Sequence, residues 1–320
     1  PFGAWDILTD GTLQLSPQGL TASGISSGAF MAVQLQVAHA SVFQGVGALA
    51  GGMWGCANGN SYDAQNVCME NPQKIDSKIY VEKVHKAFSD KKIEDPAEIQ
   101  GKPFFVYAGS KDSTIRLEAA LRLTEFIQAL GGKVQIKIDV PAEHGFPTLD
   151  TGNECDKKGL PWIQNCNYDG AGAVLQALYG SLKGRGKALE ANLQIFSQAE
   201  FQTVGSGLGD VGYIYIPTGC RGAQSSGCRL HVALHGCRMS PDFVKDAFYK
   251  QAGYNNWAEK NNIVVLYPSA KIAELNPRGC WDWFGYTGAN YLDKDAKQIV
   301  AIKAMTDRLL QETNTQRKTH

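Results

Sequence analysis

A serine with the surroundings of a nucleophile stands near the start of the chain. Ser26 is the central residue of Gly24-Ile25-Ser26-Ser27-Gly28, a G-x-S-x-G pattern. In hydrolases this pattern forms a sharp turn between a strand and a helix, and its small residues let the backbone make that turn. The turn exposes the serine oxygen and places the next N–H at a helix N-terminus, where it can stabilise an oxyanion. We predict that Ser26 is the nucleophile, with Ser27 as the competing serine outside the central position.

A serine hydroxyl needs a general base, and six histidines are available. His144 lies in a loop that follows a predicted strand, at the carboxyl end of the sheet where active sites gather. His235 also follows a strand and precedes a glycine, so it is the alternative base. The others fall inside predicted helices, inside a strand or at the C-terminal end, where packing or surface positions are expected: His39, His85, His231 and His320.

The base in turn needs an acid that orients it. Asp112 follows a predicted strand by a few residues and falls between the serine and the histidine, which is the chain order of α/β-hydrolases. Asp139 and Glu143 are alternatives close to His144, although a residue adjacent to a histidine usually points away from its ring. Asp112 has an alternative role as a charge at the N-terminus of the following helix.

The elements that must position these residues alternate between strand-like and helix-like segments. This alternation predicts an α/β fold with a mostly parallel central sheet and helices on both faces. The predicted strands are 20–25, 46–50, 103–108, 134–140, 211–217, 230–234 and 263–267. The predicted helices are 29–40, 77–88, 115–130, 170–182, 241–261 and 294–311. Since no repeat, linker or low-complexity run interrupts the chain, we expect residues 1–320 to form a single catalytic domain.

The composition excludes several classes of function. Lysine plus arginine and aspartate plus glutamate both number 31, so the chain lacks the basic excess of a nucleic-acid binder. No apolar run reaches the roughly 18–20 residues that span a membrane. No cysteine pair has zinc spacing, so neither a metal nor a cofactor is expected. We expect a compact monomer that binds neither nucleic acid nor membrane.

The cysteines indicate an oxidising compartment. The chain has eight of them, and close spacing suggests disulfides that join near neighbours, with the remaining two cysteines joined to each other. The expected pairs are Cys56 with Cys68, Cys155 with Cys166, Cys220 with Cys228, and Cys237 with Cys280. The chain begins Pro1-Phe2-Gly3-Ala4-Trp5, without a leader, which fits a mature secreted, extracellular protein. The alternative is a cytosolic protein with reduced cysteines in its core.

A second oxyanion donor is missing from its usual place. An α/β-hydrolase normally supplies it from a loop before the nucleophile, and little chain precedes Ser26. The segment Val232–Cys237, which contains L-H-G-C, looks like the missing strand and loop. It resembles the corresponding segment of extracellular polyhydroxybutyrate (PHB) depolymerases and related polyester or feruloyl-type esterases. The segments Val265–Pro268, Asn276-Pro277 and Cys280–Phe284 resemble the same family, whose single-domain fungal members are the nearest match.

This resemblance implies a circularly permuted α/β-hydrolase fold. Read in the family's order, the segments from about 211 to 311 come first and those from 20 onward follow. The old termini would be joined near residues 184–210. Such a permutation is tolerable because chain termini often lie close together at the surface.

The resemblance also assigns roles to individual residues. It makes Ser26 the nucleophile, Asp112 the orienting acid and His144 the base, and the backbone N–H groups of Ser27 and Cys237 the oxyanion hole. His235 then becomes a structural member of its loop. The aromatic residues of C-W-D-W-F either border the acyl pocket as substrate-binding residues or pack under the Cys280 disulfide: Trp281, Trp283 and Phe284.

The function implied is hydrolysis of poly(3-hydroxybutyrate) and related short-chain polyesters through an acyl-enzyme on Ser26. The partner would be a solid polyester or a hydroxybutyrate oligomer. Without a separate polymer-binding domain, adsorption would use an apolar patch on the catalytic domain. A feruloyl or acetyl esterase acting on plant polysaccharide is the alternative enzyme. A non-catalytic hydrolase-like binding protein is the alternative from another class, but such proteins commonly lose the serine or the histidine.

Overall fold

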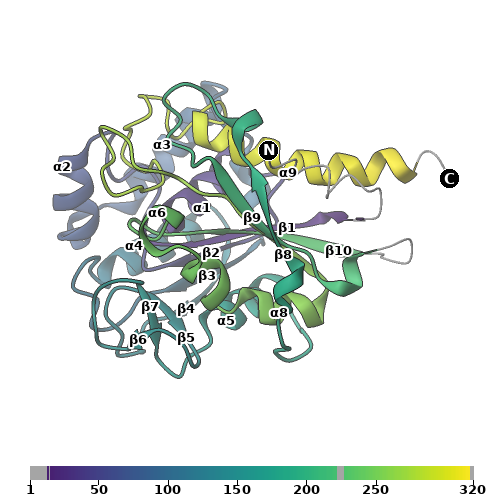
Figure 1. Ribbon diagram of the computed structural model, residues 1–320. Coiled ribbons are helices and arrows are strands. Elements are labelled where there is room, and N and C mark those ends of the chain that lie inside the picture. The colour runs from purple at the N-terminus through teal and green to yellow at the C-terminus, as the bar shows by residue number, and fades with distance from the viewer. Residues whose placement is uncertain (1–12, 14, 222–226, 318–320) are drawn as a thin grey trace.

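The central feature of the fold is a long twisted sheet (Figure 1). The computed structural model describes residues 13, 15–221 and 227–317, so the predictions made for Pro1–Trp5 and His320 lie outside it. Within these ranges eight strands form one sheet in the order β4-β3-β2-β1-β10-β11-β9-β8. Their bounds are β1 Leu15–Ile25, β2 Val46–Leu49, β3 Pro103–Tyr107, β4 Lys133–Lys137, β8 Leu193–Ser197, β9 Val211–Tyr215, β10 Cys228–Leu234 and β11 Ile263–Tyr267.

The pairing of the strands is parallel from β4 through to β11, and only the last two pairings, β11 with β9 and β9 with β8, are antiparallel. Strand β1 lies between β2 from the first half of the chain and β10 from the second half. The two halves therefore meet at the strand that leads into Ser26. This arrangement is a circularly permuted α/β-hydrolase fold, as the sequence predicts.

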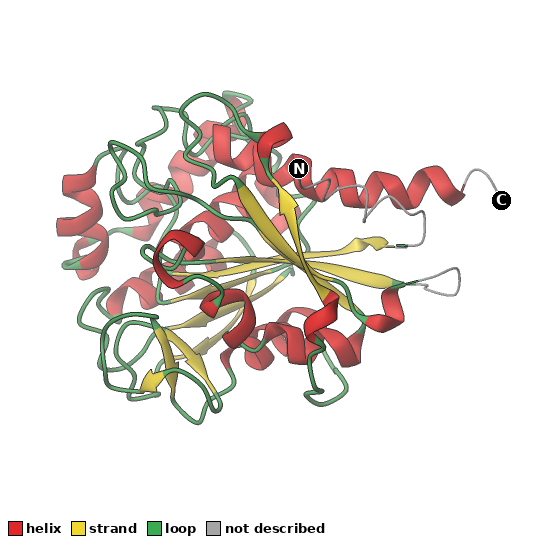
Figure 2. Ribbon diagram, viewed as in Figure 1, coloured by secondary structure: helices red, strands yellow, loops and turns green. Residues whose placement is uncertain are grey.

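Helices cover both faces of the sheet (Figure 2). The α-helices of the described ranges are α1 Ser27–Ala38, α2 Ser61–Asp63, α3 Ser77–Ser89, α4 Glu118–Ala129, α5 Gly170–Tyr179, α6 Pro241–Val244, α7 Ala247–Gln251, α8 Tyr254–Asn261 and α9 Lys297–Arg317. Among these helices none combines the length and the apolar character needed to cross a membrane.

The core consists of two layers because successive strand residues point to opposite faces. On β3, Phe104 and Val106 pack in the layer that contains residues of α1, α4 and α9. Phe105 and Tyr107 pack in the other layer, with residues of α5, α7 and α8. Since both faces are covered, the strand reads as a continuous apolar run, which is why its position could be predicted.

The predicted helix over residues 241–261 is wrong. The structure breaks this segment into α6, α7 and α8. Lys245 (φ 52°) and Gly253 (φ 95°) adopt left-handed backbone conformations that end one helix and precede the next. Strand β8 and a small sheet of three short strands were not predicted from the sequence. The three strands are β5 Phe146–Thr148, β6 Asn153–Glu154 and β7 Ile163–Asn165.

Four disulfides are present in the described ranges, with the pairing expected from the sequence. Three of them close short loops, and the fourth joins Cys237 to Cys280 across 43 positions of sequence. This long-range disulfide ties the loop after β10 to the C-W-D-W-F segment.

Candidate active site

Ser26 occupies a strained turn between β1 and α1. Its φ is 56° and its ψ is −122°, a combination that costs a non-glycine residue about 1–3 kcal/mol and is concentrated at functional sites. The glycines on either side are required by close packing. A Cβ on Gly24 would lie 2.3 Å from the Gly28 carbonyl carbon, and one on Gly28 would lie 2.4 Å from the Leu234 oxygen. The G-x-S-x-G pattern therefore reflects the space available at this turn.

The loop after β10 lies directly against Ser26. A Cβ added to Gly236 would be 3.2 Å from the Ser26 Cβ and 3.3 Å from the Ile25 oxygen. The backbone N–H groups of Ser27 and Cys237 have no hydrogen-bond acceptor among the described residues. Two free N–H donors on the two segments that meet at a serine hydroxyl are the arrangement that stabilises a tetrahedral oxyanion.

Asp112 and His144 form a buried hydrogen-bonded pair. Their loops follow β3 and β4, and Nδ1 of His144 lies 2.8 Å from Oδ2 of Asp112. The other carboxylate oxygen, Oδ1, accepts the N–H groups of Thr114 at 2.8 Å and Ile115 at 2.9 Å. The aspartate thus makes both of the interactions weighed from sequence, since it binds the histidine and also caps the chain that leads toward α4. With Nδ1–H donated to the carboxylate, Nε2 is left able to accept a proton.

The nucleophile and this pair lie at the same edge of the sheet, because β1, β2, β3 and β4 are adjacent and parallel. Among the described residues, Ser26 Oγ and His144 do not form a hydrogen bond with each other. In free enzymes this contact is often longer than a hydrogen bond and tightens when substrate binds.

The alternative residues considered from the sequence have other partners. The imidazole of His235 donates from Nδ1 to the Gly236 oxygen at 2.8 Å and accepts at Nε2 from the Ala270 N–H at 3.0 Å. Burial lowers the pKa of His235 to about 4. Asp139 forms an exposed ion pair with Lys137. His235 and Asp139 are therefore not available as base and acid.

The hydroxyl of Ser27 also has a partner other than a base. It accepts the N–H of Trp281 at 3.3 Å. This contact joins the start of α1 to the C-W-D-W-F segment, whose Cys280 is bonded to Cys237. The two candidate oxyanion donors are thereby connected to each other through one short stretch of chain.

The three aromatic candidates differ in exposure. Trp281 is fully buried, and Trp283 is nearly so and stacks on Phe30 of α1 with ring centroids 4.1 Å apart. Phe284 is half-buried and contacts the Trp283 ring edge-on. The buried indole N–H of Trp281 has no acceptor among the described residues. The C-W-D-W-F segment thus packs on the first turn of α1, and of its three aromatic residues Phe284 is the one that is partly exposed to solvent.

Two residues near His144 were not singled out as binding or positioning groups from the sequence. The ring of Trp162 lies edge-on to the imidazole, with centroids 6.1 Å apart. The carboxylate of Glu143 accepts the backbone N–H groups of Ser113 and His144. In addition, no three histidine, cysteine, aspartate or glutamate side chains of the described ranges are placed to share a metal ion.

The fold and the site define a serine hydrolase, and comparison with known proteins gives the family. Residues 2–169, which include Ser26, Asp112 and His144, match the model of the prolyl oligopeptidase family. The chain is 39% identical over 302 residues to the poly(3-hydroxybutyrate) depolymerase of Delftia acidovorans, covering 93% of this chain and 60% of that protein. It is 34% identical to the polyhydroxybutyrate depolymerase of Talaromyces funiculosus, covering 90% of this chain and 88% of the relative.

Solved structures agree with this assignment. A PHB depolymerase crystal structure from Penicillium funiculosum superposes with a TM-score of 0.84 at 31% identity, covering 94% of this chain and 98% of the other. A PHB depolymerase with a serine replaced by alanine, complexed with an R3HB trimer, superposes with a TM-score of 0.85 at the same identity and coverage. The chain belongs to the polyhydroxybutyrate depolymerase family.

Proposed function

We propose that this protein hydrolyses the ester bonds of poly(3-hydroxybutyrate) through an acyl-enzyme on Ser26. The observation that carries the proposal is the buried Asp112–His144 pair, at the same sheet edge as a serine held in a strained turn. The substrate class rests on the family, one member of which has been crystallised with an R3HB trimer. The four disulfides support a secreted protein.

The first half of the reaction forms a covalent intermediate. Ser26 Oγ attacks the ester carbonyl carbon while Nε2 of His144 takes the hydroxyl proton, and Asp112 stabilises the resulting imidazolium. The carbonyl oxygen becomes an oxyanion held by the N–H groups of Ser27 and Cys237, each worth about 3–4 kcal/mol in the barrier. Collapse of this intermediate expels the alcohol end of the polymer, which receives the proton from His144.

The second half releases the acid. Water gives a proton to His144 and attacks the carbonyl carbon of the acyl-enzyme, and the same N–H groups hold the second oxyanion. The carbon–Oγ bond then breaks, Ser26 regains its proton from His144, and a 3-hydroxyacid leaves. Each proton taken by the base is returned within the same half-reaction, so the residues named suffice for the chemistry.

The aromatic segment is the proposed border of the acyl site. Phe284 offers a half-buried ring, and Trp283, which stacks on Phe30 of α1, contacts that ring edge-on. We further propose that the protein acts as a monomer on solid polymer or on hydroxybutyrate oligomers.

Replacement of the nucleophile tests the proposal. Ser26→Ala should lower kcat on amorphous poly(3-hydroxybutyrate) and on p-nitrophenyl butyrate by about 10⁶-fold. Ser89→Ala is the matched control, because Ser89 is an exposed serine on α3 that bonds only its own helix. Mass analysis of the soluble products should find 3-hydroxybutyrate and its oligomers. Full activity in Ser26→Ala would refute the assignment of the nucleophile.

Two further measurements separate the alternative functions. Faster release of ferulate or acetate than of hydroxybutyrate from matched substrates would indicate an esterase of plant polysaccharide. Failure of a fluorophosphonate probe to label the wild-type protein would indicate a binding protein without a working triad. We expect hydroxybutyrate release to be fastest and labelling to be complete.

A further inference from the structure

The carboxylate of Glu143 joins the loop of the base to the loop of the acid. Its Oε2 accepts the backbone N–H of His144 at 2.8 Å, and its Oε1 accepts the backbone N–H of Ser113, also at 2.8 Å. Ser113 directly follows Asp112. One half-buried side chain therefore bonds to the main chain of the candidate base and to the residue next to the candidate acid.

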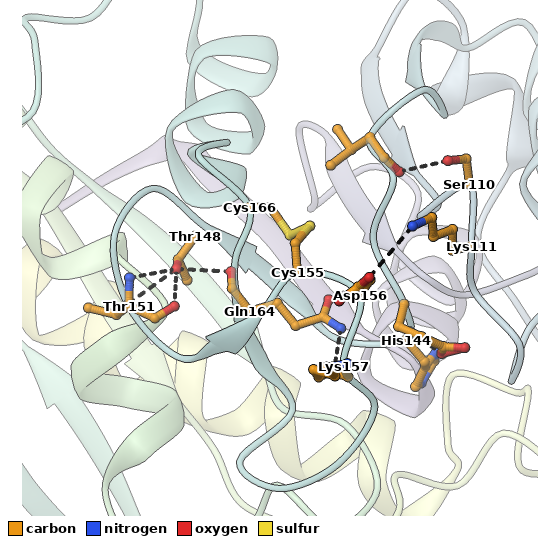
Figure 3. Close-up of a disulfide and its surroundings, with 12 residues drawn as sticks. Ser110, Lys111, His144, Thr148, Thr151, Cys155, Asp156, Lys157, Gln164 and Cys166 are labelled. Carbon is orange, nitrogen blue, oxygen red and sulfur yellow. Dashed lines mark hydrogen bonds and ion pairs between the residues drawn. A yellow bond between two sulfur atoms is a disulfide. The ribbon is translucent and has the colours of Figure 1, made fainter.

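The backbone of Glu143 is itself anchored. Its N–H donates to the Cys155 oxygen at 2.9 Å, and Cys155 is bonded to Cys166. We call residues 153–166, which contain this disulfide, the strap (Figure 3). The strap also touches the acid loop, because Asp156 pairs with Lys111 at 3.6 Å. Glu143 thus lies between the strap and the two loops that carry the catalytic pair.

Further contacts hold the chain after His144. The N–H of Phe146 donates to the Trp162 oxygen at 2.8 Å, and Gly145 lies so close to the Gln164 side chain that a Cβ would be 2.6 Å from it. The Trp162 ring stands edge-on to the imidazole. The strap therefore fixes the residues on both sides of His144, and the Glu143 carboxylate adds a side-chain link from the base loop to the main chain of the acid loop.

We propose that Glu143 is a positioning residue, which holds His144 at the correct distance and angle from Asp112. The proposal rests on the function proposed above, because it assigns Asp112 and His144 their roles. Hydrogen bonds from N–H groups to a carboxylate are short and strong. A shift of about 1 Å in a catalytic group can cost about 10²-fold in rate. Since the Glu143 carboxylate bonds backbone N–H groups while Asp112 binds the imidazole, Glu143 acts through the backbone and takes no proton in the reaction.

The variant Glu143→Gln tests the bridge at constant size. Its amide keeps one acceptor oxygen and presents N–H donors to the other backbone N–H, so one of the two bonds is lost. We expect kcat for p-nitrophenyl butyrate to fall by about 10- to 100-fold, with KM within two-fold of wild type. Glu154→Gln is the control, because it removes a charge from an exposed strap residue that bonds neither loop. It should keep the wild-type kcat.

A second variant separates the bridge from the charge. Glu143→Asp keeps the carboxylate but is one methylene shorter, so it cannot reach both N–H groups. We expect it to lose as much kcat as Glu143→Gln. Wild-type kcat in Glu143→Gln, or full recovery in Glu143→Asp, would overturn the proposal, the latter because charge alone would then suffice.

A spectroscopic measurement distinguishes positioning from a general loss of structure. The Nδ1 proton of His144, hydrogen-bonded to a carboxylate, should give a downfield ¹H NMR signal in wild type. We expect this signal to broaden or disappear in both Glu143 variants while the melting temperature stays within a few degrees. An unchanged signal would contradict the proposal. If wild type hydrolyses no ester, the proposed function fails, yet this signal still tests the role of Glu143.

Discussion

Nδ1 of His144 and Oδ2 of Asp112 are 2.8 Å apart, and the side chain of Asp112 is completely shielded from solvent. The second oxygen of the same carboxylate accepts two backbone N–H groups. These bonds hold the carboxylate in place on its own loop, so the imidazole has a fixed acceptor. The pair therefore sets both the orientation and the tautomer of His144.

The first prediction concerns this tautomer. Asp112→Asn keeps the size of the side chain but can present an N–H to Nδ1, which favours the tautomer with its proton on Nε2. A base protonated at Nε2 cannot accept the serine proton, so kcat on p-nitrophenyl butyrate should fall by about 10⁴-fold. Steady-state kinetics check the result. Asp139→Asn, which removes an exposed carboxylate paired with Lys137, should retain wild-type kcat, and equal losses in both variants would contradict the assignment.

The second prediction concerns the oxyanion donors. Gly236→Ala would place a Cβ 3.2 Å from the Ser26 Cβ and 3.0 Å from the Met239 sulfur. The loop must shift, and the Cys237 N–H moves with it. We expect kcat to fall by about 10²–10³-fold, the effect of losing one oxyanion donor, with little change in KM.

Gly184→Ala is the matched control for this prediction. It adds the same methyl group where no heavy atom lies within 4 Å and where the backbone is not left-handed. Kinetics on p-nitrophenyl butyrate should show wild-type values for this control. Wild-type kcat in Gly236→Ala would remove the loop after β10 from the oxyanion hole.

The fold could be predicted where local pattern and tertiary environment agree. Apolar runs such as Ile263–Tyr267 are buried on both faces, and the predicted strand has the bounds of β11. The pattern failed over residues 241–261, since a helical periodicity does not reveal the left-handed residues Lys245 and Gly253 that interrupt it. Strands of two or three residues, as in the small sheet, are held by pairing with distant segments and leave no periodic signal.

The residues of the candidate site likewise fall into those that local sequence pattern reveals and those that only the fold brings together. Ser26, Asp112 and His144 could be proposed because residue type and position after a strand carry chemical information. Glu143 could be judged from the sequence only as an alternative acid beside His144. Its contact with the Ser113 N–H depends on how two loops 30 positions apart lie against each other, which no local pattern encodes. The contact between the rings of Trp162 and His144 likewise depends on how the strap lies against the loop of the base.

The third prediction compares two disulfides. Cys237–Cys280 closes a loop of 43 positions and Cys220–Cys228 one of eight. In the chain-entropy model, replacing the longer link by two alanines should cost about 4 kcal/mol of unfolding free energy and replacing the shorter about 2.5 kcal/mol. Urea unfolding of the two double variants measures both. A larger loss from Cys220→Ala/Cys228→Ala would contradict the loop-length argument.

The fourth prediction concerns pH and a histidine outside the active site. His231 is fully buried on β10, where Nδ1 lies 2.7 Å from Thr21 Oγ1 and Nε2 lies 2.7 Å from Ser23 Oγ. Burial lowers the pKa of His231 to about 3, against about 6.5 in an unfolded chain. Above pH 6.5 the residue is neutral in both states, so its full contribution to stability is present there.

As the pH falls below 6.5, the unfolded chain binds a proton at this position before the folded protein does. The unfolding free energy should therefore decrease with falling pH, by up to about 1.4 kcal/mol per pH unit from this residue, until the folded pKa near 3 is reached. In His231→Gln this contribution is absent, so urea unfolding between pH 6 and 4 should show a shallower slope. His85→Gln removes an exposed histidine from α3 and should keep the wild-type slope. An equal slope in wild type and His231→Gln would mean that His231 binds its proton equally well in the folded and unfolded states. That result would contradict the prediction, because complete burial between two hydroxyls disfavours the protonated form in the folded protein.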